Sequence, residues 1–425
     1  MPSPVPLAAA TDVAALAWHA VTAVEEARAV LVGASARPLE PTAVAVAYTS
    51  ERWLRVDGSA PRAFAPLSGF FRAADGWVRT HANYPHHRRA LLSALHLSAG
   101  ADELDRVRAE LARRPAETAA AAISAHGGLC VTVRPADAAV DEQLRARPVV
   151  ETTRLGDAPT RAVQVSDAER PLAHTRVLDL TRVIAGPVAS RTLALWGADV
   201  LRIDPPHLPE LPWQHLDTGH AKRSTLLDLG TGTDRAGFDA LLASTDVVVL
   251  GYRSDGLERR GLSAASLARR RPGLIVLQLT AWPDPSRRGF DSLVQAESGI
   301  AWEESRDGEH PGALPAQALD HSAGYLLAAA ALELLHRREI EGGSWLARTS
   351  LRRIAAELLG FPRPPRAAAV PPIDETGHLQ SFDVDGVSLV TAAPALPGAR
   401  FRAPRPWGRD LPRWRSDDGR AESVR

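Results

Sequence analysis

The chain has 425 residues, of which 45% are hydrophobic and 24% are charged, and its formal net charge at pH 7 is +0. This length allows two or three globular domains, and the charge balance gives no overall field that would favour nucleic acid or a membrane surface as a partner. The single cysteine, Cys130, excludes an intramolecular disulfide.

We find no targeting signal in the sequence and therefore predict a cytoplasmic protein. The first residues, MPSPVPLAAATDVAALAW, have no basic segment ahead of their apolar part, so we expect no signal peptide. No uncharged apolar run reaches the roughly 18 residues that a membrane span needs, so we expect no membrane span either.

The region before residue 170 predicts a small α+β unit. Its expected helix, Asp102–Arg114, is amphipathic with well-spaced opposite charges. Two short segments flank this helix: Asp75–Arg79 is expected to be a turn that leads into a strand, and Gly127–Val133 is expected to be a strand.

From Thr175 onward, apolar runs alternate with helical segments. The expected strands are Arg176–Leu180, Asp199–Ile203, Ser224–Leu229, Asp246–Leu250 and Leu274–Thr280. The expected helices are Pro187–Trp196, Gly237–Ser244 and Leu262–Arg271. This alternation predicts an α/β fold with a parallel sheet and helices on both of its faces. Ligands of such sheets bind at the carboxyl ends of the strands.

Several motifs argue against nicotinamide and metal chemistry. The loop Gly230–Gly237, GTGTDRAG, has its third glycine two positions too late for a dinucleotide site, and Phe238 stands where a phosphate loop needs lysine. The sequence has no H-E-x-x-H, no G-x-S-x-G and no paired cysteines. His86 and His87 are adjacent, so we expect their side chains to point apart in solvated or capping positions. We predict no metal cofactor.

Asp320 stands at the start of an apolar, alanine-rich segment, Ala318–Leu335, ALDHSAGYLLAAAALELL. As a helix N-cap, its carboxylate would accept hydrogen bonds from free amides and meet the positive end of the helix dipole. The same place suits a catalytic carboxylate, because the helix end would keep it ionised and nearby amides would stabilise an oxyanion. The pattern alone leaves both roles open.

Basic residues recur around the expected strand ends. They are Arg182, Arg202, Lys222, Arg223, Arg253, Arg259, Arg260, Arg287 and Arg288. Each alone is typical of a solvated surface charge, but their shared edge of the sheet also suits a ligand with several phosphates.

Five segments, in order, resemble the class III CoA-transferases, the family of formyl-CoA transferase, carnitine CoA-transferase and α-methylacyl-CoA racemase. They are Val177–Asp204, Ala221–Leu229, Asp246–Ser263, Arg287–Gly299 and Leu319–Leu335. The first is similar to the opening strand, helix and strand of the family, and the last to the helix led by its nucleophilic aspartate. The resemblance implies a Rossmann-like large domain with Asp320 as the nucleophile.

The order of the domains differs from that of the family. The segment DGWVRTHANYPHHRRALLSALHL resembles the small domain that usually follows the large one, and here it comes first. We expect a poorly matched N-terminal segment at 1–65, a small α+β domain at 66–160, a Rossmann-like CoA-binding domain at 170–345, and a late helix with an irregular tail at 346–425. The family forms interlocked dimers, so the resemblance also implies a homodimer.

The chemistry implied by the resemblance is transfer of coenzyme A between an acyl-CoA and a carboxylic acid, through covalent intermediates on Asp320. Coenzyme A would bind along the strand-end loops of the large domain. The matching positions are Arg182, Ala185, Tyr252, Arg259 and Arg288.

Two alternative functions stay open. Racemases of the family carry a histidine in a G-H-D motif, where this chain has Gly289-Phe290-Asp291. An acyl-CoA racemase or epimerase would therefore need another base, and His321 is the local candidate. The other alternative is a non-catalytic CoA-binding paralogue or subunit. It is motivated by the changed domain order and by Ile184, Pro205 and Gly251, which replace groove residues frequent in the family.

Overall fold

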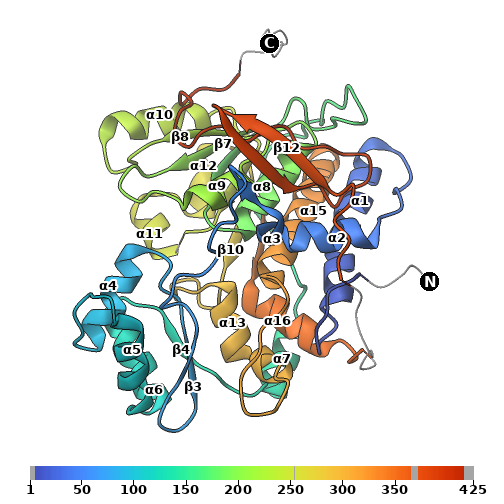
Figure 1. Cartoon of the computed structure of the whole chain (residues 1–425). Coiled ribbons are helices and arrows are strands. Elements are labelled where there is room, and N and C mark those ends of the chain that lie inside the picture. Colours follow the sequence, from blue (N-terminus) through green and yellow to red (C-terminus); the bar gives the residue numbers. More distant parts are fainter. Residues whose placement is uncertain (1–4, 253, 365–371, 416–425) are drawn as a thin grey trace.

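The computed structural model describes residues 5–252, 254–364 and 372–415. A seven-stranded sheet forms its centre and confirms the predicted α/β fold (Figure 1). The strands are β5 (Glu151–Gly156), β6 (Arg176–Leu180), β7 (Asp199–Asp204), β8 (Arg223–Leu226), β9 (Val247–Leu250), β10 (Ile275–Thr280) and β11 (Ser344–Ser350).

The strand order is β5-β11-β10-β9-β6-β7-β8. Every neighbouring pair from β11 to β8 is parallel, whereas β5 is antiparallel to β11. The sheet is therefore mixed, not purely parallel as predicted. Counted along the chain from β6, the parallel strands lie in the order 3-2-1-4-5-6, which is the order of doubly wound Rossmann sheets.

Helices cover both faces of this sheet, and further helices lie in the same part of the chain. In chain order they are α8 (Ala185–Leu195), α9 (Pro212–Thr218), α10 (Gly232–Leu242), α11 (Ser254–Arg259), α12 (Ala264–Arg270), α13 (Asp291–Ser298), α14 (Ile300–Glu303), α15 (Ala318–Glu341) and α16 (Leu351–Gly360). Val247 and Val249 of β9 pack in one core with α8 and α15, and Val248 and Leu250 pack in the other with α10 and α12. Burial on both faces explains why this strand is apolar throughout.

Helix α10 begins at Gly232, ahead of the Gly237 expected from the sequence. The hydroxyl of Thr231 caps it by accepting a hydrogen bond from the backbone N–H of Asp234. Part of the glycine-rich segment is thus the first turn of a capped helix.

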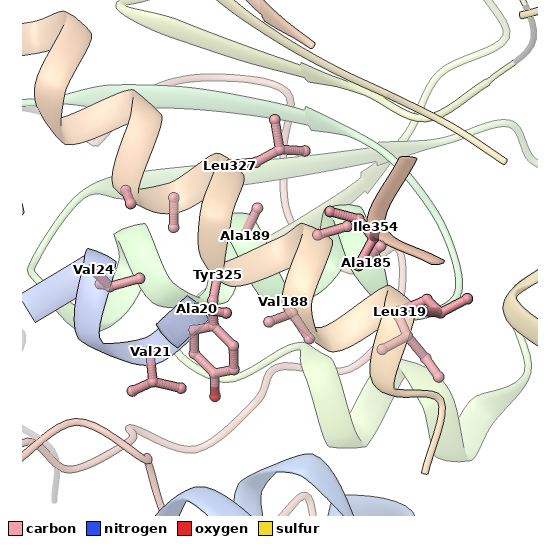
Figure 2. Packing of buried hydrophobic residues seen from close by; sticks show 14 of the residues in the cluster. Ala20, Val21, Val24, Ala185, Val188, Ala189, Leu319, Tyr325, Leu327 and Ile354 are labelled. Atoms are coloured by element: carbon pink, nitrogen blue, oxygen red, sulfur yellow. The ribbon is translucent and has the colours of Figure 1, made fainter. Parts of the chain in front are cut away.

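Helix α15 is buried along most of its length (Figure 2). Helix α1 (Val13–Val32) packs against it from the N-terminal region, through Val21 and Val24 among others, and α8 packs beside it through Val188. An apolar surface on all sides is typical of a helix enclosed by protein. The first residues of the chain that the structure describes are therefore part of the main core.

The small unit has its own sheet, of order β2-β3-β4, and its own core. Its elements are β2 (Phe70–Arg72), β3 (Trp77–Thr80), β4 (Cys130–Thr132), α4 (Pro85–Ala94), α5 (Glu103–Ala112), α6 (Ala116–Ala125) and α7 (Ala138–Arg145). Figure 1 shows α4, α5 and α6 together at one end of the molecule. Helix α7 packs on α16.

A third sheet joins the two ends of the chain. It has the order β1-β13-β12, formed by β1 (Arg55–Val56), β12 (Leu379–Val384) and β13 (Val387–Ala392), and α2 (Pro41–Tyr48) and α3 (Ser50–Trp53) precede β1. The region 346–425, expected to end in an irregular tail, thus contains a hairpin. β5 likewise joins the large sheet from within the region 66–160. The domain boundaries otherwise stay predictions.

Among the described residues, no helix combines the length and the apolar character that crossing a bilayer requires.

Candidate active site

The centre of the sheet contains the switch point at which doubly wound folds form a ligand-binding crevice. Strands β6 and β9 are neighbours, and the chain continues from them toward opposite edges of the sheet. At such a switch point, the loops after the two strands diverge and leave a crevice. Arg182 follows β6 and Tyr252 follows β9, each by two residues.

Both of these side chains present unsatisfied polar atoms. The guanidinium of Arg182 donates to the carbonyl of Pro209 at 2.7 Å and lies 4.9 Å from the ring centre of Tyr84, but its Nε has no partner in the described structure. The hydroxyl of Tyr252 also lacks a partner there, and burial raises its pKa. Buried polar groups of this kind are usually satisfied, so their presence here indicates a place for ligand atoms.

Asp320 lies inside the first turn of α15 and is not its N-cap. The helix begins at Ala318, with Gln317 in the cap position. The carboxylate of Asp291, the first residue of α13, accepts the backbone N–H of Asp320 at 2.9 Å. The N-cap interpretation of Asp320 is therefore wrong, and Asp291 is the group that satisfies an amide at this helix start.

The two carboxyls form a buried, like-charged pair. Burial raises the pKa of Asp320 well above its ordinary value, and the charge of Asp291 raises it further. Burial also raises the pKa of Asp291 to about 6, against hydrogen bonds from the Asp320 amide and the Gln295 side chain. Burial therefore opposes the ionisation of Asp320 that the helix end was expected to favour. Two such groups favour holding one proton between them.

Comparison with known proteins identifies the region that carries this site. Residues 172–369 match the family described as CoA-transferase family III. We refer to this matched region as the family III domain.

The family III domain has relatives among named proteins. A probable fatty acyl-CoA transferase of Mycobacterium tuberculosis is 31% identical over 210 residues, which are 45% of this chain and 53% of that protein. A succinate–glutarate CoA-transferase of Agrobacterium fabrum is 33% identical over 152 residues, 31% of this chain and 38% of the relative. A crystal structure of the M. tuberculosis protein covers 44% of this chain and 55% of its own, at 33% identity and a TM-score of 0.42. The chain thus spans about half, or less, of the length of these relatives.

Around the crevice of the family III domain, the structure brings some of the predicted CoA-site residues together. Burial, with smaller effects from the charges of His86, Arg288 and Arg182, lowers the pKa of His87 to about 3. Arg182 and Arg288 therefore both lie near this buried imidazole. Ala185 is the first residue of α8 and is buried. Arg259 is different, because its side chain is 65% exposed and pairs with Asp255 at 3.2 Å.

The adjacent histidines differ from expectation. The imidazole of His87 is buried, and the two ring centres lie only 4.1 Å apart. The interpretation of this pair as solvated side chains that point apart is wrong for His87, because the small unit packs it against the family III domain.

Two of the basic residues expected near a phosphate ligand are internal ion pairs. Arg202 bonds to Asp204 at 2.7 Å, and Lys222 bonds to Asp179 at 3.0 Å, each with its side chain at most 2% exposed. Burial lowers the pKa of Lys222 to about 8, against the opposing charge of Asp179. Such groups stabilise each other in the core and are not available to a ligand. Arg253 lies outside the described residues.

The N-terminal region adds residues to the site that the sequence analysis missed. The hydroxyl of Tyr48, at the end of α2, lies 3.0 Å from Ser322 Oγ, and its ring lies 5.2 Å from that of His321. Both nitrogens of His321 lack partners in the described structure, and burial lowers its pKa to about 3. No local sequence pattern links Tyr48 to a helix that begins 270 residues later.

Phe290, which replaces the histidine of racemases, has a histidine as its neighbour. The ring of His81, from the small unit, stacks on Phe290 with centres 3.9 Å apart and planes 10° apart. Burial lowers the pKa of His81 well below its ordinary value, with a smaller effect from His87. His81 is therefore a neutral imidazole that packs on Phe290, the residue before Asp291, and only tertiary packing brings it there.

Proposed function

We propose that this protein transfers coenzyme A between an acyl-CoA and a carboxylic acid, with Asp320 as the nucleophile. The observation that carries the proposal is the position of Asp320 in a family III domain, at the start of α15 and fixed by Asp291. Because Asp291 holds the backbone of Asp320 and the carboxylate is buried, that carboxylate loses little conformational freedom when it attacks a thioester.

The path between Asp320 and the crevice is short. Gly324, one helical turn after Asp320, packs so closely on α8 that a Cβ there would lie 2.6 Å from the carbonyl oxygen of Ala185. Four residues of α-helix rise about 6 Å. Asp320 therefore lies near the start of α8, which follows Arg182 in the chain. Coenzyme A bound by Arg182, Ala185 and Tyr252, with Arg259 and Arg288 at its charged end, would place a thioester within reach of Asp320.

The reaction consists of exchanges at carbonyl carbons and needs no oxidant or metal. A carboxylate oxygen of Asp320 forms a bond to the thioester carbon, the C–S bond breaks, and CoA leaves as the thiolate from a mixed anhydride. The thiolate then attacks the Asp320 carbonyl carbon, which releases the donor acid and leaves an aspartyl-CoA thioester. The acceptor carboxylate repeats both steps in reverse and leaves with CoA.

Asp291 has two tasks in this scheme. Its carboxylate orients the Asp320 backbone through the 2.9 Å hydrogen bond, and it can hold the proton that the pair favours while Asp320 attacks as the carboxylate. Asp291 is thus a positioning residue, and only Asp320 forms covalent bonds.

The decisive experiment is the intact mass of the protein after incubation with a panel of acyl-CoA donors. We expect an adduct of CoA or acyl size that hydroxylamine removes, in the wild type but not in Asp320→Asn. Asp307→Asn is the matched control, because Asp307 is an exposed aspartate paired with His310 and should keep the adduct.

Two other results would contradict the proposal. Deuterium entering the α-carbon of an acyl-CoA from solvent, without acyl exchange, would support the racemase or epimerase instead. Tight CoA binding with no adduct from any donor would support a non-catalytic CoA-binding paralogue or subunit. The cytoplasmic location and the homodimer stay predictions.

A further inference from the structure

Glu210 is a buried carboxylate that joins the small unit to the family III domain. It lies between β7 and α9 in the chain, and its side chain is 0% exposed. Burial opposes its ionisation, but the charges of Arg202 and Arg182 outweigh burial and lower the pKa of Glu210 to about 2. The carboxylate accepts hydrogen bonds from the Tyr84 hydroxyl at 2.7 Å, the backbone N–H groups of Val183 and Leu211 at 3.0 Å each, Arg202 at 3.0 Å and Arg182 at 3.4 Å.

Two of these donors belong to the loop that follows β6 at the switch point. Val183 has a φ of +70°, in the left-handed region that a β-branched residue seldom adopts. Such a conformation is strained and persists only where its surroundings hold it. The bond from the Val183 N–H to Glu210 holds the backbone, and the bond from Arg182 holds the adjacent side chain. Glu210 therefore fixes this loop at two successive residues.

Tyr84 reaches the same loop from the small unit. It precedes α4 and is 6% exposed. The core of the small unit is made by other side chains, so Tyr84 is buried by its contacts outside that core. Its hydroxyl donates to Glu210, and its ring centre lies 4.9 Å from the guanidinium carbon of Arg182. Tyr84 thus acts on Arg182 directly through its ring and indirectly through Glu210.

We propose that Tyr84 is a positioning residue for coenzyme A: its hydroxyl holds Glu210, and Glu210 holds Arg182 in the orientation that binds CoA. A hydroxyl that donates to an ionised carboxylate makes a short bond, stronger than one between neutral groups. The enclosed carboxylate has no exposed surface at which bulk water would replace that bond. This inference rests on the proposed function, in which Arg182 contacts CoA, and adds a residue of the small unit to it.

The test is a double-mutant cycle of Tyr84→Phe and Arg182→Gln in the full chain, with the Kd for CoA measured by isothermal titration calorimetry. Tyr84→Phe removes the hydroxyl and keeps the ring, so we expect a Kd about 3- to 20-fold above that of the wild type. Arg182→Gln should raise the Kd about 10- to 100-fold. Because Tyr84 acts through Arg182, the double variant should bind CoA within about 2-fold of Arg182→Gln alone.

Two further readouts separate positioning from a merely structural role. In Tyr84→Phe, the KM for the acyl-CoA should rise with the Kd while kcat stays within about 2-fold of the wild type. Tyr325→Phe is the matched control, because Tyr325 is 3% exposed, bonds to Arg191 and packs in the main core with α1 (Figure 2). It loses the same hydroxyl, and its Kd for CoA should stay within about 2-fold of the wild type.

An unchanged Kd in Tyr84→Phe or in Arg182→Gln, or equal losses from Tyr84→Phe in both backgrounds, would overturn the assignment. If Tyr84→Phe does not fold, Glu210→Gln, which keeps the shape of the side chain, takes its place in the cycle. A wild type that binds CoA but forms no adduct on Asp320 contradicts the proposed function alone, and the cycle still decides.

If the wild type does not bind CoA, the proposed function fails, and the reaction of Arg182 with phenylglyoxal judges the contact by itself. Peptide mass spectrometry measures this rate. Faster modification of Arg182 in Tyr84→Phe than in the wild type and Tyr325→Phe supports the positioning role, and equal rates in the three proteins overturn it.

Discussion

Replacement of Asp291 by asparagine should change the stability of the protein in opposite directions at low and high pH. The pKa of Asp291 is raised from 3.8 to about 6 by burial. A carboxyl with a raised folded-state pKa contributes stability below its unfolded value, and this contribution is lost as the pH rises from about 4 through 6. By pH 8 the two-unit difference amounts to about 3 kcal/mol of destabilisation.

Asparagine removes this ionisation cost but also one acceptor. Asp291 accepts from the backbone N–H of Asp320 and from Gln295 Nε2, and an amide has a single oxygen to serve them. The lost hydrogen bond costs about 1 kcal/mol. Asp291→Asn should therefore be about 2 kcal/mol more stable than the wild type at pH 8 and about 1 kcal/mol less stable at pH 4.

Differential scanning calorimetry at the two pH values, at equal ionic strength, measures this change. An unfolding entropy of about 2.1 cal/mol/K per residue gives roughly 0.9 kcal/mol/K for 425 residues. The expected shifts in Tm are thus about +2 °C at pH 8 and about −1 °C at pH 4. Asp307→Asn is the control of opposite sign, because backbone amides of His310 and Glu309 lower the pKa of Asp307. A lower Tm for Asp291→Asn at pH 8, or equal shifts at both pH values, would refute the reasoning.

Two further predictions concern the packing that supports the site. Gly324→Ala should destabilise the protein by about 1–3 kcal/mol in urea unfolding, because its Cβ would meet the Ala185 carbonyl, whereas Gly237→Ala, in open space on α10, should stabilise it by up to about 1 kcal/mol. Lys222→Met should cost about 3–5 kcal/mol in the same assay because it leaves Asp179 buried without its charged partner, and adding Asp179→Asn should recover part of the loss. A neutral effect of Gly324→Ala, or no recovery in the double variant, would contradict these expectations.

Local patterns were sufficient to predict most of the central sheet. Strand β9 is a short apolar run buried on both faces, and such a run is visible in any window of the sequence. Strand β5 was missed because its residues, ETTRLG, are largely polar and at most half-buried. It is a strand only because β11 offers an unpaired edge. The pairing of β1 with β13 joins residues more than 300 positions apart, which no periodicity can indicate.

By itself, the sequence determined the fold class and the identity of the acid at the start of α15, because both depend on residue order over short stretches. Only the tertiary structure decided the state of that acid. The packing of α13 against α15 brings Asp291 to Asp320 across 29 residues. The packing of the small unit brings Arg79 to the same place. Charges interact through space, and desolvation depends on everything that surrounds a group. The residues next to Asp320 in the sequence therefore cannot predict either effect on its pKa.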